Sequence, residues 1–166
     1  LQTLQDASRL APLQGQVWQM LGEMQYDLED LEAAEISWKQ SITVDPAYLP
    51  PYSLLATLYR EAANPDQARE ILARAREAVP GSYLVDLYVA RFEQEQGNWA
   101  GAEAALQRAI QKAPGQSAPY EAIYSYLYEN QQFDQAKEYL LKAIVAEPGG
   151  DWLLSALFQV DYVLIE

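Results

Sequence analysis

The sequence predicts an all-α protein in which pairs of antiparallel helices repeat along the chain. The first observation is a proline that recurs every 34 residues, at Pro12, Pro46, Pro80, Pro114 and Pro148. The second is an alanine that recurs at the same interval, at Ala34, Ala68, Ala102 and Ala136. A fixed period of this length indicates a repeat array, in which each repeat is one supersecondary unit that stacks on its neighbours.

The period divides the chain into four full repeats and two partial ones. The full repeats span residues 15–48, 49–82, 83–116 and 117–150. Residues 1–14 have the phase of a second helix from a preceding partial repeat. Residues 151–166 have the phase of the first helix of a fifth repeat, or of a terminal capping helix. Because a repeat should not begin with its second half, we expect the chain to be a fragment or a mature product of a longer protein.

Each repeat carries start and stop signals for two helices. Asp30, Asn64 and Asn98 suit helix N-caps, where a side-chain oxygen accepts hydrogen bonds from free backbone N–H groups. Pro65 follows at the first helical position, where a missing N–H costs nothing. The recurring prolines end each second helix, since the residue before a proline is pushed out of the α region. Small residues at the eighth, twentieth and twenty-seventh places allow the two helices to approach closely.

The first repeat resembles the tetratricopeptide repeat family. The segment WQMLGEMQYDLEDLEAAEISWKQSITVDP (residues 18–46) carries the tryptophan, leucine-glycine, alanine, aromatic and proline positions of that family at the expected spacing. The resemblance covers the whole chain and implies a right-handed superhelical solenoid. It also implies that the first helix of each repeat lines a concave face and the second helix a convex face.

The third and fourth repeats depart from the family pattern. Asp86 replaces an aromatic residue at the fourth place, and Glu93 lies at a place that is usually apolar. Tyr124 replaces a small residue at the eighth place. We expect these substitutions to leave the fold intact and to change the helix spacing locally.

Composition excludes several classes of function. The 166 residues carry a formal net charge of −13 and include no cysteine and no histidine. Disulfides, Cys/His zinc sites, cysteine nucleophiles and histidine bases are therefore excluded. Nucleic-acid binding needs a basic surface that displaces counterions, so the acidic balance argues against it. No membrane-spanning segment, metal-ligand spacing or cofactor motif is visible, so we expect no enzyme activity. We expect a soluble protein of the cytoplasm or the periplasm.

The family resemblance places candidate ligand residues on the first helices. The predicted peptide groove contains Tyr26, Arg60, Leu84, Leu87, Tyr88, Arg91, Gln94 and Tyr128. An acidic residue also recurs at the thirteenth place of each repeat, at Asp27, Glu61, Glu95 and Glu129. This acidic row suits a ligand that carries lysines or arginines, or it is a solvated edge paired with nearby bases. Arg91 suits a peptide carboxylate, or it pairs with Glu95 four residues later.

These observations favour a protein–protein interaction scaffold that binds a peptide segment or a helix of a partner in the concave groove. One alternative is a non-catalytic arm that recruits substrate or regulates a larger enzyme or export complex, such as a glycosyltransferase or a polysaccharide exporter. Another is self-assembly through the ends, because residues 151–166 form an apolar segment suited to a homo-oligomer contact.

Overall fold

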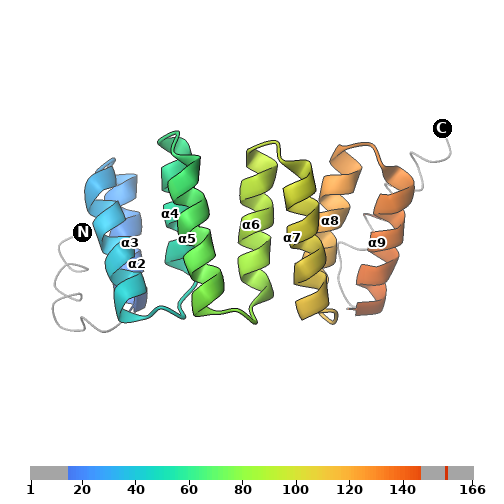
Figure 1. Ribbon diagram of the computed structural model, residues 1–166, viewed down its shortest axis with the longest axis horizontal. Helices are drawn as coiled ribbons and strands as arrows, with labels where there is room; N and C mark the ends of the chain where they lie inside the picture. The colour runs from blue at the N-terminus through green and yellow to red at the C-terminus, as the bar shows by residue number, and fades with distance from the viewer. Residues whose placement is uncertain (1–14, 147–155, 157–166) are drawn as a thin grey trace. The chain divides into compact units, whose positions relative to one another are not determined.

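The computed structural model describes residues 15–146 and Ala156, and every element within residues 15–146 is an α-helix (Figure 1). The chain forms two compact units, which meet in the sequence between Pro80 and Gly81. The helices predicted for residues 1–14 and 151–166 lie outside the described residues, with the exception of Ala156.

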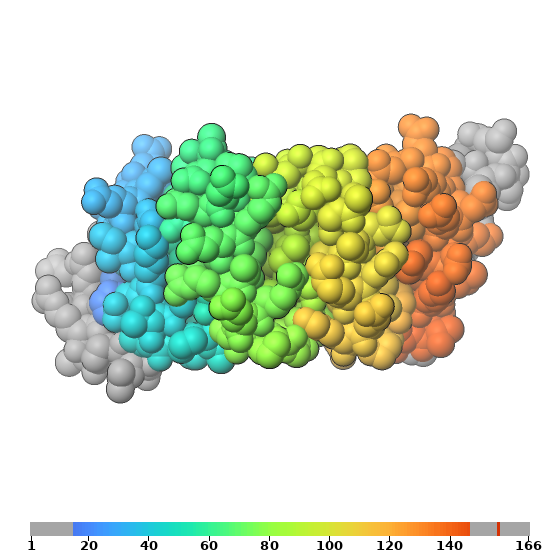
Figure 2. Space-filling view, in the orientation of Figure 1, coloured from blue at the N-terminus to red at the C-terminus, as the bar shows by residue number. Residues whose placement is uncertain are grey.

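Unit 1 contains two helix pairs. Its helices are α2 (Gly15–Asp27), α3 (Leu31–Val44), α4 (Pro50–Glu61) and α5 (Pro65–Ala78). Each helix packs against the next one along the chain, so α3 contacts both α2 and α4. In the space-filling view, α3 and α5, coloured cyan and green, form much of the visible face of this unit (Figure 2).

Unit 2 repeats this arrangement. Its helices are α6 (Tyr83–Glu95), α7 (Trp99–Lys112), α8 (Ser117–Glu129) and α9 (Phe133–Ala146). Consecutive helices pack together, and α6 also contacts α8. The core of this unit includes an apolar cluster built around residues such as Leu106, Ile123, Leu127 and Leu140. We refer to α2, α4, α6 and α8 as first helices and to α3, α5, α7 and α9 as second helices.

The predicted helix signals are confirmed. The side chains of Asp30, Asn64 and Asn98 accept hydrogen bonds from backbone N–H groups at the starts of α3, α5 and α7, at 3.2–3.3 Å. Pro65 is the first residue of α5. The helices α3, α5 and α7 end two residues before Pro46, Pro80 and Pro114 respectively.

The turn between the first and second helix has the same backbone geometry in all four repeats of the described chain. One residue there has a positive φ: 62° at Glu29, 55° at Ala63, 71° at Gly97 and 59° at Gln131. These residues lie 34 positions apart. A left-handed residue after a helix satisfies the last carbonyls, as in the bond from Asn64 N to Tyr59 O at 2.8 Å. Only the third repeat uses glycine here.

The sizes of two facing residues compensate for each other within repeats. In the first repeat the eighth place is Gly22, which lies against Trp38 of α3. A Cβ atom built on Gly22 would collide with the indole ring, so the glycine leaves room for the tryptophan. The next two repeats place alanine and leucine at these positions, and all four residues are buried: Ala56, Leu72, Ala90 and Leu106.

The fourth repeat accommodates Tyr124 at the same eighth place. Its side chain is buried in the core cluster of unit 2 together with Leu140, and its ring lies 5.8 Å from that of Tyr128. Burial raises the pKa of the Tyr124 hydroxyl. The departure from the family pattern is therefore absorbed by aromatic packing inside this unit.

At the fourth place of the repeat, a tyrosine is replaced by an aspartate in the third repeat, and nearby cations neutralise its charge. Tyr52 donates a hydrogen bond to the carbonyl of Pro46 at 2.9 Å, and Tyr120 donates to the carbonyl of Pro114 at 3.0 Å. In the third repeat Asp86 replaces this tyrosine and is fully buried. Two cations of α7 neutralise its carboxylate, Arg108 at 3.1 Å and Lys112 at 2.7 Å.

Candidate functional site

A cavity opens in unit 1 at the surface of the two first helices. It is lined by Glu23, Tyr26, Asp27, Trp38, Leu54 and Thr57 and has a volume of about 350 Å³. The first three residues belong to α2, Leu54 and Thr57 belong to α4, and Trp38 reaches the cavity from α3. Because α3 packs between the two first helices, its indole ring forms part of the bottom of the cavity.

The bottom of the cavity is aromatic and fixed. The rings of Tyr26 and Trp38 lie 5.8 Å apart with an interplanar angle of 37°. The indole Nε1 of Trp38 donates a hydrogen bond to the carbonyl of Gln19 at 3.1 Å. Trp38 is 2% exposed, so its position is set by packing against α2 and by this bond. The cavity is therefore preformed and does not require the tryptophan to move.

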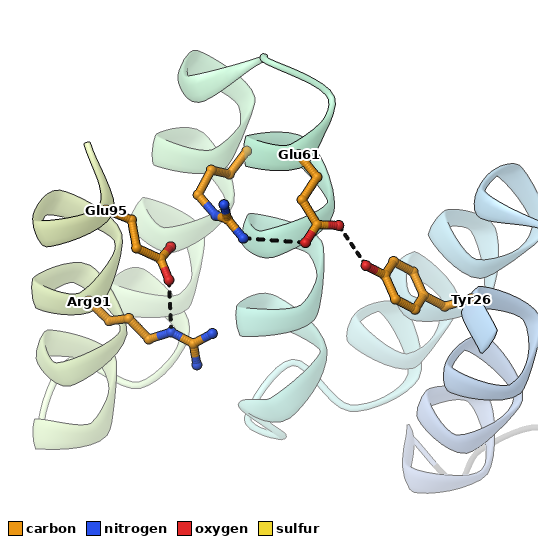
Figure 3. Close-up of polar contacts among 5 residues, drawn as sticks. Tyr26, Glu61, Arg91 and Glu95 are labelled. Carbon is orange, nitrogen blue, oxygen red and sulfur yellow. Dashed lines mark hydrogen bonds and ion pairs between the residues drawn. The ribbon is translucent and has the colours of Figure 1, made fainter. Parts of the chain in front are cut away.

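A polar network holds Tyr26 at the rim (Figure 3). The Tyr26 hydroxyl donates a hydrogen bond to Oε2 of Glu61 at 2.6 Å. The other carboxylate oxygen of Glu61 pairs with Arg60 at 3.3 Å. The hydrogen bond to Glu61 is the main reason that the pKa of the Tyr26 hydroxyl is raised above its usual value of 10.0. The ring orientation of Tyr26 is therefore fixed from α4, the next first helix.

The acidic row divides into paired and unpaired carboxylates. Glu61 pairs with Arg60, and Glu95 accepts from Nε of Arg91 at 3.2 Å (Figure 3). Asp27 and Glu129 are exposed, and neither forms an ion pair among the described residues. Two of the four members thus pair with a nearby base, and Arg91 pairs with Glu95 as the sequence spacing allowed.

The predicted groove residues of unit 2 divide between surface and core. Leu84 is 39% exposed on α6, and Arg91 is exposed on the same helix. Leu87 and Tyr128 are half-buried and pack against the core cluster of this unit. The Tyr128 ring also makes an edge contact with Phe133 at 5.3 Å. The two remaining groove residues, Tyr88 and Gln94, are half-buried on α6. That these residues bind a ligand stays a prediction.

Sequence reasoning identified part of the cavity and missed part of it. Tyr26 and Asp27 belong to the predicted groove and the acidic row. Trp38 was missed because it lies on a second helix, which the family resemblance assigns to the convex face. The signal available in the sequence was Gly22, since a glycine facing a large residue indicates that the large side chain crosses between helices.

The described part of the chain shows neither a metal site nor a membrane span. No three acidic side chains come together within residues 15–146 in a way that could hold a metal ion. No helix in the same range is long and apolar enough to cross a membrane. The cavity itself offers carboxylates, a hydroxyl and aromatic rings.

Two family models described as tetratricopeptide repeat match the chain, one over residues 15–48 and the other over residues 53–117. Together they cover more than half of the sequence. No curated protein matches the chain in a sequence comparison.

Solved structures share the fold at low sequence identity. Yeast Tom70 is 20% identical with a TM-score of 0.83, over 97% of this chain and 35% of its own, so the chain spans about a third of its length. TTC0263, a thermophilic TPR protein of Thermus thermophilus, is 20% identical with a TM-score of 0.71, over 98% of this chain and 88% of its own. Pseudomonas aeruginosa pilF is 20% identical with a TM-score of 0.66, over 89% of this chain and 68% of its own.

These matches agree with the 34-residue proline period, with the repeated N-caps and with the helix pairs of both units. Proteins of this fold are typically non-catalytic interaction scaffolds. The chain belongs to the tetratricopeptide repeat family, and its fold is an all-α helical repeat solenoid.

Proposed function

We propose that this chain is a scaffold that binds a peptide segment or a helix of a partner protein at the surface of its first helices. The observation that carries the proposal is the cavity of unit 1, whose rim combines side chains of α2 and α4. The partner is proposed to be a protein because proteins of this fold are typically interaction scaffolds. The binding surface is proposed from the position of the cavity and from the exposed residues of the first helices.

The cavity has the properties of a recognition pocket for one anchoring side chain. Its volume of about 350 Å³ lies at the lower end of the roughly 300–1,000 Å³ that ligand pockets occupy. Tyrosine and tryptophan are enriched at binding surfaces because they offer a large contact area at low entropic cost. Because the rings are already held in place, binding does not have to order them.

The proposal predicts that a lysine placed inside the cavity weakens peptide binding. Peptides selected for binding from a displayed random library would be synthesised with a fluorophore and titrated by fluorescence polarisation. We expect Leu54→Lys to weaken their binding at least about tenfold, because the added ammonium group occupies the cavity and loses its hydration when the peptide covers it. Circular dichroism checks that the variant is folded.

The matched control is Ile36→Lys, which makes a comparable change from an aliphatic side chain to lysine at a residue of α3 that is 61% exposed and does not line the cavity. This control should leave affinity unchanged. Arg91→Glu tests the first-helix surface of unit 2 in the same assay. Equal affinities for Leu54→Lys, Arg91→Glu and wild type would place binding elsewhere on the molecule.

A further inference from the structure

We infer that the cavity of unit 1 takes a lysine or arginine side chain of the partner peptide. This inference rests on the proposed function, since it names the chemistry of the side chain that anchors the peptide. Three properties of the cavity lining support the inference. Its charge is negative, its aromatic hydrogen-bond donors already bond to other protein groups, and its bottom is aromatic.

The charge of the described lining is negative. Among the residues that the structure describes, those that line the cavity include Glu23 and Asp27 and no lysine or arginine. Both carboxylates are exposed, and neither forms an ion pair with another described residue. The cation beside the rim, Arg60, pairs with Glu61. A cationic ligand group therefore meets two carboxylates that form no ion pair with any other described residue.

The aromatic hydrogen-bond donors of the lining are already used. Tyr26 donates its hydroxyl proton to Glu61, and Trp38 donates its Nε1 proton to the carbonyl of Gln19. The polar groups that remain are the carboxylates of Glu23 and Asp27 and the hydroxyl of Thr57. Ionised carboxylates accept hydrogen bonds and donate none. The cavity thus offers mainly acceptors, which disfavours a carboxylate or phosphate ligand and favours an ammonium or guanidinium group.

The bottom of the cavity suits the remainder of such a side chain. Leu54 and the rings of Tyr26 and Trp38 provide an apolar surface below the charged rim. Lysine and arginine bury their methylene stems on apolar surfaces while the charged head remains near water. A cation within about 6 Å of a tyrosine or tryptophan ring also gains a favourable cation–π interaction. The unpaired carboxylates at the rim and the rings below them match the two ends of one long cationic side chain.

The test uses the full 166-residue chain and the fluorescent peptides selected by display, with each arginine replaced by citrulline or each lysine by norleucine. We expect a lysine or arginine at a fixed position of the selected peptides. Its neutral replacement should weaken binding by about three- to tenfold, the range for two exposed charge pairs. The double variant Glu23→Gln/Asp27→Asn should weaken the cationic peptide by the same factor and leave the neutral one unchanged.

The matched control is Glu29→Gln/Glu32→Gln, which removes two charges of the same unit that do not line the cavity. Raising the salt concentration should weaken the cationic peptide on wild type and affect the double variant less. Peptides that lose binding on Leu54→Lys but show no preference for a cation would overturn this inference and leave the proposed function intact. Peptides indifferent to Leu54→Lys, or no selected peptide at all, would overturn both.

Discussion

The left-handed turn between the two helices of a repeat leads to two predictions: one substitution there should lower the stability of the protein, and the reverse substitution in another repeat should raise it. Gly97 has a φ of 71°, and a Cβ atom built on it meets no other atom within 4 Å. Gly97→Ala therefore costs only the backbone penalty of a left-handed residue, roughly 1–2 kcal/mol. Glycine loses more entropy on folding by about 0.5–1 kcal/mol. The net expectation is a loss of about 0.5–1 kcal/mol for Gly97→Ala.

The reverse substitution should gain the same amount in unit 1. Ala63 has a φ of 55°, so Ala63→Gly removes the backbone penalty. The neighbouring Ala62 has a φ of −76° and supplies the control, since Ala62→Gly adds entropy cost without relieving strain. Urea unfolding followed by circular dichroism measures the change, provided that the unfolding slope stays constant. The reasoning fails if Ala63→Gly destabilises the protein as much as Ala62→Gly does.

Three further experiments test packing and charge. Gly22→Ala should cost about 1–3 kcal/mol by pushing against Trp38, measured by urea unfolding with tryptophan fluorescence. Replacing both α7 cations beside Asp86 with alanine should cost about 3–5 kcal/mol, because a buried carboxylate loses two countercharges, and adding Asp86→Asn should recover part of this in thermal unfolding. The Lys39 ammonium holds the pKa of Glu35 below 4.5. Glu35→Gln should therefore lose up to about 1 kcal/mol at about pH 7 and match wild type once the pH falls through that lowered pKa.

The helix pairs could be predicted from the sequence because their signals are local. An N-cap side chain such as Asn64 bonds to a backbone group three residues away, and a proline ends the helix that precedes it. These effects depend on neighbouring residues and recur with the repeat. The left-handed turns carried no such signal, since Glu29, Ala63 and Gln131 occupy positions where the conformation favours glycine. There the geometry is imposed by the two helices that the turn joins.

Contacts between residues far apart in the sequence could not be predicted in the same way. The repeat pattern marked Asp86 as an exception, but it did not identify Arg108, which lies 22 residues later on the facing helix. The family resemblance put Tyr26 and Asp27 on one surface, since it assigns the first helix of each repeat to the concave face. The contribution of Trp38 required the packing of α3 between α2 and α4, which the spacing of residues within one helix does not reveal.

The ion cluster around Asp86 has a consequence for exchanging segments among the repeats. In the second and fourth repeats the fourth-place tyrosine bonds to a backbone carbonyl, so its partner does not depend on side-chain identity. Asp86 instead depends on two particular side chains of α7. The segment α5 has Arg74 where α7 has Arg108, but Ala78 where α7 has Lys112. A chimaera that joins α6 to α5 would retain one of the two cations that α7 places beside Asp86, so we expect the third repeat to tolerate exchange of its second helix less well than its neighbours do.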